Sequence, residues 1–111
     1  MKEDRSMDVI DRIKTAEARL NRASRAFKAL EEALRAYEAV GADVELVSSY
    51  YGSPDWFSDV EAYDSGKLGV DPTTLPAGIL SEDSAYDLLT EYNDLAIEMS
   101  RISGEALAKE L

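Results

Sequence analysis

The chain predicts an all-α fold, an elongated helical bundle in which two long antiparallel, coiled-coil-like helices carry two short helices at one end. Its Ala-, Glu- and Leu-rich composition favours helix. Apolar residues recur at steps of three and four near both ends of the chain, as expected for helices that each bury one face. The 111 residues fit one domain, residues 1–111.

The first helix is predicted over residues 4–40, because neither Pro nor Gly interrupts the first forty residues and Gly41 is a natural stop. Its apolar residues form one narrow seam, typical of a coiled coil. The seam consists of Val9, Ile13, Ala16, Leu20, Ala23, Phe27, Leu30, Leu34 and Tyr37. The two small alanines in it permit close approach of a partner helix.

Two short helices are predicted next, over residues 42–51 and 54–64. Gly52 ends the first of them. Ser53 and Pro54 then supply an N-cap and a first-turn proline, which begin the second.

Residues 65–80 are predicted to form a loop, since they contain three glycines and two prolines. The loop also holds apolar residues, so we expect it mainly to pack over the bundle, although a functional role stays open. Ser81 caps the last helix, predicted over residues 82–103, which Gly104 ends or weakens. The seam of this helix consists of Ala85, Leu88, Tyr92, Leu95, Met99 and Ile102.

A charged row flanks each of the two long seams. Arginines follow the first seam and glutamates the last, each at intervals of seven residues: Arg5, Arg12 and Arg19, and Glu91, Glu98 and Glu105. Like flanks face each other in an antiparallel pair, so these rows predict that the two helices pair with Arg19 near Glu91. The register is open by one heptad. The end of the first helix then needs cover from the middle helices or from a second copy of the chain.

Five of the nine aromatic residues lie within fourteen positions: Tyr50, Tyr51, Trp56, Phe57 and Tyr63. Such a cluster could be a partner pocket, because Tyr and Trp combine apolar area with a polar tip. We favour the alternative, in which the cluster is the main core of a small bundle.

Two groups of acidic residues are candidates for metal binding or acid–base chemistry. The first comprises Asp55, Asp59, Glu61 and Asp64, whose spacing lacks the order of a calcium-binding EF-hand loop. The second comprises Asp87, Glu91, Asp94 and Glu98, with no nucleophile or phosphate-binding loop to work with. We interpret both groups as solvated or ion-paired helix faces, and we predict no metal, no cofactor and no catalytic residue.

Composition excludes several functional classes. The chain has no Cys and no His, which removes disulfides, zinc sites and Ser-His triads. Residues 1–40 carry a net charge of +1 and residues 41–111 of −12, so the acidic part would repel nucleic acid. No run of residues is long and apolar enough for a membrane span, and no secretory signal begins the chain. We therefore expect a cytoplasmic protein that binds neither nucleic acid nor membrane.

Several short motifs resemble a family of small uncharacterised bacterial proteins that is catalogued as a domain of unknown function. They are the Tyr-Tyr-x-Ser-x-x-Trp pattern at residues 50–56 and the Leu-Ser-Glu-Asp helix start at residues 80–83. The resemblance covers about residues 10–100. It implies a small bacterial helical protein and brings no activity, substrate or catalytic residue.

The sequence predicts a protein without enzymatic activity, most simply a protein-interaction module whose partner is another protein or a second copy. One alternative is an acidic inhibitor or immunity-type protein that binds a basic partner. Another is a carboxylate-metal enzyme. The candidate partner surface consists of Tyr50, Tyr51, Trp56, Tyr63, Asp87 and Asp94.

Overall fold

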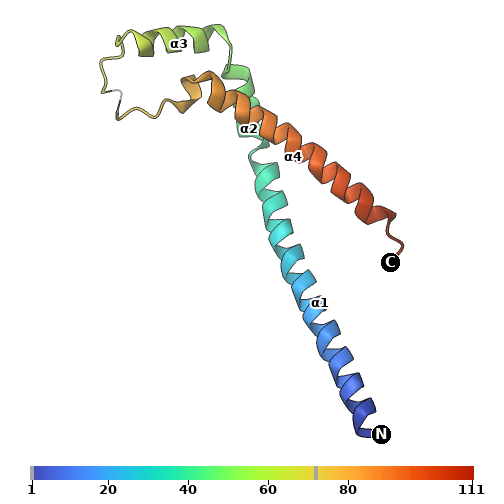
Figure 1. The fold of residues 1–111 in the computed structure, drawn as a ribbon. Helices are drawn as coiled ribbons and strands as arrows, with labels where there is room; N and C mark the ends of the chain where they lie inside the picture. The colour runs from blue at the N-terminus through green and yellow to red at the C-terminus, as the bar shows by residue number, and fades with distance from the viewer. Residues whose placement is uncertain (1, 72) are drawn as a thin grey trace. The chain divides into compact units, whose positions relative to one another are not determined.

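A computed structural model describes residues 2–71 and 73–111, with side chains from Asp8 onward. The structure is all-α: 81% is helical, and no strand occurs among the described residues. In chain order its elements are α1 (Lys2–Ala39), α2 (Gly41–Tyr50), α3 (Pro54–Asp64), the 3-10 helix η1 (Gly78–Leu80) and α4 (Glu82–Ala108) (Figure 1). The predicted class, with long and short helices, is confirmed.

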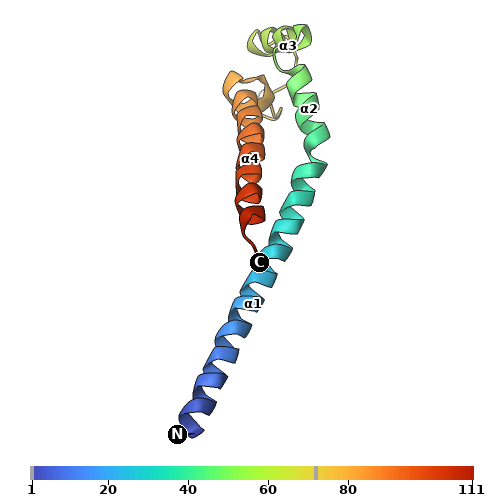
Figure 2. The same cartoon turned by 90° about the vertical axis from the view of Figure 1, so that its right-hand side faces the viewer.

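The chain divides into two units, residues 1–40 and residues 41–111, and each is described by itself. The first unit is one uninterrupted helix, α1 (Figure 2). A single helix has nothing within its own unit against which to bury its apolar face. Its seam is accordingly open, with Ile13 62%, Leu20 63% and Phe27 70% exposed.

The second unit has a small core where α3, η1 and the start of α4 meet (Figure 1). Among the described residues only Trp56 on α3 and Ala85 on α4 are buried, at 4% and 2% exposure. Helix α2 packs against α4. The core of this unit therefore depends on one large aromatic side chain.

Local signals fix the ends of α3 where the sequence predicts them. Gly52, with φ of +77°, occupies the left-handed region after α2. The Ser53 hydroxyl accepts a hydrogen bond from the Trp56 backbone N–H at 3.1 Å, and Pro54 takes the first helical position. The same cap therefore starts α3 and places Trp56 in its first turn.

Several boundaries differ from the prediction. Helix α2 begins at Gly41 because the break in the backbone falls at Val40, one residue earlier than expected. The predicted loop over residues 65–80 contains η1 at its end. Helix α4 continues through Gly104 to Ala108, because the cost of about 1 kcal/mol for a helical glycine is too small to end a helix supported by neighbouring ion pairs.

The predicted antiparallel orientation of the two long helices involves one helix from each unit, and it stays a prediction. The Arg5 side chain, which belongs to the predicted arginine row, lies outside the described side chains. Among the described residues, no helix is long and apolar enough to cross a membrane.

Candidate functional site

Trp56 is the centre of the aromatic cluster, and it belongs to the core. Its indole Nε1–H donates a hydrogen bond to the Ile79 carbonyl oxygen at 2.9 Å, which ties α3 to η1. The Tyr51 and Phe57 rings meet it edge to face, with ring centroids 5.2 and 5.0 Å away. With 4% of its surface exposed, Trp56 fits the core interpretation of the cluster. The candidate partner surface that includes it stays a prediction.

The contact between Trp56 and η1 also positions the start of α4. Ser81 follows η1 directly, and its hydroxyl oxygen accepts the Ser84 backbone N–H at 3.2 Å. Thus η1, which is bonded to Trp56 of α3, leads directly into the N-cap of α4.

A tyrosine–carboxylate pair joins α2 to α3 at the surface. The Tyr50 hydroxyl donates a hydrogen bond to Asp59 Oδ2 at 2.6 Å. This bond, some desolvation and the negative charges of Asp59 and Asp55 raise the pKa of Tyr50 above its ordinary value. Asp59 therefore has a structural partner, which argues against it as a free metal ligand.

A shallow apolar pocket lies next to this pair. Tyr50 and Asp59 form its polar edge, and the rest of its lining comes from the loop and η1: Leu68, Leu75, Pro76, Ala77, Ile79 and Leu80. The expected packing of the loop is partial, since Leu68 and Leu75 remain 44% and 38% exposed while Ile79 and Leu80 are half-buried. Nothing in the spacing of these residues could have predicted the pocket, because it depends on where the loop returns.

The loop contains one local anchor at Asp71. Its Oδ1 accepts hydrogen bonds from the Thr73 backbone N–H at 2.9 Å and from the Thr73 hydroxyl at 2.8 Å. These two bonds, the backbone one first, lower the pKa of the Asp71 carboxyl below its ordinary value. Asp71 thus has hydrogen-bonded partners within the loop itself.

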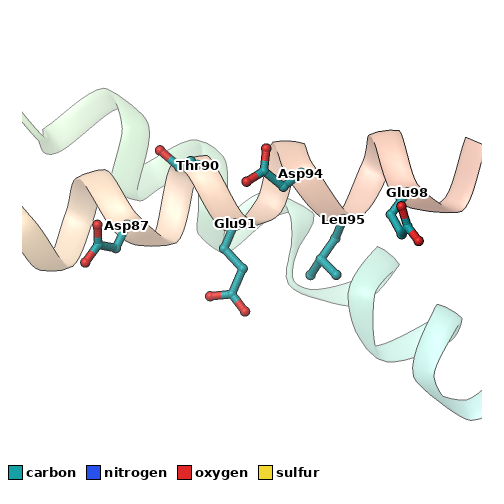
Figure 3. Close-up of a pocket in the computed structure, with 6 residues that line it drawn as sticks. All are labelled: Asp87, Thr90, Glu91, Asp94, Leu95 and Glu98. Atoms are coloured by element: carbon teal, nitrogen blue, oxygen red, sulfur yellow. The ribbon is translucent and has the colours of Figure 1, made fainter.

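A continuous acidic strip runs along α4. Figure 3 shows the carboxylates of Asp87, Glu91, Asp94 and Glu98 following one another along the helix, with Leu95 between the last two turns. All four acids are exposed. Among the described residues of the second unit, Asp87, Glu91 and Asp94 have no ion-pair partner. We call these four acids with Leu95 the α4 strip.

One arginine on α4 forms an ion pair with a glutamate of the α4 strip. Arg101 forms ion pairs with Glu98 and, at 3.0 Å, with Glu105, one turn to either side. The hydrogen bond from Arg101 lowers the pKa of Glu98 below its ordinary value. The sequence prediction missed this partner because it looked for one on another helix, although spacings of three and four along one helix were enough to find it.

The remaining candidate residues do not converge on one site. Tyr50, Tyr51 and Tyr63 are half-buried in the second unit, and Asp87 and Asp94 are exposed on α4. The acids on α3 that were considered as metal ligands, Asp55, Asp59, Glu61 and Asp64, are all exposed. Among the described residues, no group of three or more His, Cys, Asp or Glu side chains is arranged to hold a metal ion.

Comparison with known families places the chain in one of them. A family model described as a domain of unknown function, DUF4298, matches residues 13–102. The chain therefore belongs to the DUF4298 family, and the resemblance noted in its sequence is confirmed to that extent. No curated protein and no solved structure matches the chain.

Proposed function

We propose that this protein is a non-catalytic protein-interaction module of the bacterial cytoplasm, and that the α4 strip receives a basic partner protein. The proposal rests on the carboxylates of Asp87, Glu91 and Asp94, which have no ion-pair partner among the described residues of the second unit. Such charges steer and select partners of opposite sign more than they add affinity.

Apolar side chains beside the strip support the same role. Leu88, Leu95 and Ile102 on α4 are 43%, 46% and 51% exposed. An interface needs an apolar centre as well as a charged edge, and a row of half-exposed leucine and isoleucine next to four acids supplies both. A basic segment with alternating apolar residues is the chemistry that fits this surface.

The test is affinity capture from the native cytoplasm with matched charge variants. In the strip variant, Asp87→Asn, Glu91→Gln and Asp94→Asn remove three charges from α4. In the control, Glu45→Gln, Glu61→Gln and Asp64→Asn remove three charges from exposed positions on α2 and α3. We expect one basic protein to be retained by the natural chain and by the control, to be lost from the strip variant, and to elute as salt rises.

Equal retention by the strip variant and the control would refute the proposal. A partner that is bound through the strip and whose own activity is suppressed on binding would instead support the narrower inhibitor or immunity-type function. That alternative is favoured only by the net charge of −12 on residues 41–111, which suits a strongly basic target.

A further inference from the structure

Helix α1 is longer than α4, the helix predicted to pair with it. Gly41 lies against α4, because a methyl group placed on it would be 3.8 Å from the Tyr92 hydroxyl oxygen. From Tyr92 to its end at Ala108, α4 extends only about 24 Å. Along α1, Ile13 is already about 39 Å from Ala39. This part of α4 is therefore shorter than the length of α1 that carries the seam.

Two glutamates of the predicted glutamate row already have a partner on their own helix. Glu98 and Glu105 form ion pairs with Arg101.

From this we infer that the first half of α1 pairs with the same segment of a second copy, side by side and parallel, as a two-stranded coiled coil. The inference goes beyond the proposed function and does not depend on the α4 strip. It concerns the seam formed by Val9, Ile13, Ala16, Leu20 and Ala23.

The charges beside the seam select the parallel orientation. In a parallel pair, the residue before one seam row faces the residue five positions later on the partner helix. Arg12 then meets Glu17 of the second copy, and the reverse contact forms by symmetry. Arg19 meets the neutral Ser24. No like charges face each other across the described seam.

An antiparallel pair of the same segments would be opposed by its charges. Centred on Ala16, that arrangement brings Arg12 of one copy to Arg19 of the other, since like flanks face each other. The small side chains of Ala16 and Ala23 let the helices approach closely, while Ile13 and Leu20 fill the alternate layers. The self-complementary arrangement is therefore the parallel one.

Cysteine cross-linking in the full chain tests both partner and orientation, since the natural chain has no cysteine. We expect Ala16→Cys and Ala23→Cys each to form a disulfide-linked dimer under mild oxidation, because both face their own counterparts only in a parallel pair in register. Ala18→Cys, on the opposite side of the same helix, should not cross-link. The natural chain should sediment as a dimer at micromolar concentration.

Two substitutions separate the seam from the rest of the fold. Leu20→Asp should convert the dimer to a monomer while the Trp56 fluorescence spectrum stays unchanged, and Asn21→Asp next to it should leave the dimer intact. Arg12→Glu should weaken the dimer, and adding Glu17→Arg should restore it. Glu17→Arg would not restore the dimer if the seam paired with a partner helix through apolar contacts alone.

Two results would contradict the parallel dimer of α1. A natural chain that remains monomeric at these concentrations would overturn the inference. So would Ala16→Cys chains that cross-link only to Leu95→Cys chains, since that result would make α4 of another copy the partner. The first outcome does not bear on the α4 strip, whose test measures a different protein. The second would, because Leu95 belongs to the strip.

Discussion

The two units of this chain show how differently a helix can be stabilised. The second unit assembles four helical segments, α2, α3, η1 and α4. A Tyr50–Asp59 hydrogen bond joins α2 to α3, and the Trp56 indole joins α3 to η1. The first unit has a longer helix and a more regular apolar seam, yet nothing in its own unit covers that seam. The regular apolar seam of α1 is a surface that needs a partner helix. The core around Trp56 is built instead from irregular contacts within the second unit.

Removing the centre of the second unit should have the largest effect. Trp56→Ala deletes the most buried large side chain and its hydrogen bond to Ile79, so we expect a loss of about 3–5 kcal/mol in the free energy of unfolding. Amide hydrogen exchange should speed up in α3, η1 and the first turns of α4.

Phe57→Ala is the matched control for this change. Its ring touches Trp56 but is 62% exposed, so the cost should be near or below 1 kcal/mol. Equal losses from Trp56→Ala and Phe57→Ala would mean that the second unit has no core centred on the indole.

The next largest effect concerns the cap that orients Trp56. Ser53→Ala removes the acceptor of the Trp56 N–H and should destabilise the second unit by about 1 kcal/mol, measured by urea unfolding. Ser58→Ala, at an exposed position within α3, should be neutral or slightly stabilising. The prediction is wrong if the two substitutions cost the same.

Gly104→Ala should stabilise the far end of α4. The helix continues through this glycine, and a methyl group there would meet no atom within 4 Å. Alanine should then add about 0.5–1 kcal/mol to the stability of the last turns, seen as slower amide exchange. No change in exchange would indicate that α4 ends near residue 103, as the sequence predicts.

The smallest effect should appear only in alkali. The pKa of Tyr50 is raised in the folded chain, so the Tyr50–Asp59 bond stabilises fully below the ordinary tyrosine pKa of about 10 and is lost as pH rises through the folded value. Tyr50→Phe should be slightly less stable than the natural chain at neutral pH, with the difference disappearing in alkali. A pH-independent difference would contradict a hydrogen-bonded pair.

Local chemistry explains which parts of the fold could be predicted from sequence. The boundaries of α3 follow from Gly52, Ser53 and Pro54, whose conformational preferences act within a few residues. The all-α class follows from apolar periodicity in the same way. Each of these predictions needs only the geometry of a single helix.

Contacts over longer distances were harder to predict. The hydrogen bond from Trp56 to Ile79 and the pocket beside Tyr50 both depend on how the loop returns, which no periodicity encodes. The mutual pairing of the arginine and glutamate rows involves one helix from each unit, and it stays a prediction. Arg101, the partner actually beside Glu98, was available one turn away.

The difference between the two units can be tested in one experiment, thermal unfolding of the full chain at several concentrations, followed by both helicity and Trp56 fluorescence. We predict two transitions. Loss of α1 helicity should come first and shift to higher temperature as concentration rises, because its seam is covered by a second copy. The Trp56 transition should not move with concentration. A single transition, coincident by both signals and independent of concentration, would contradict the account.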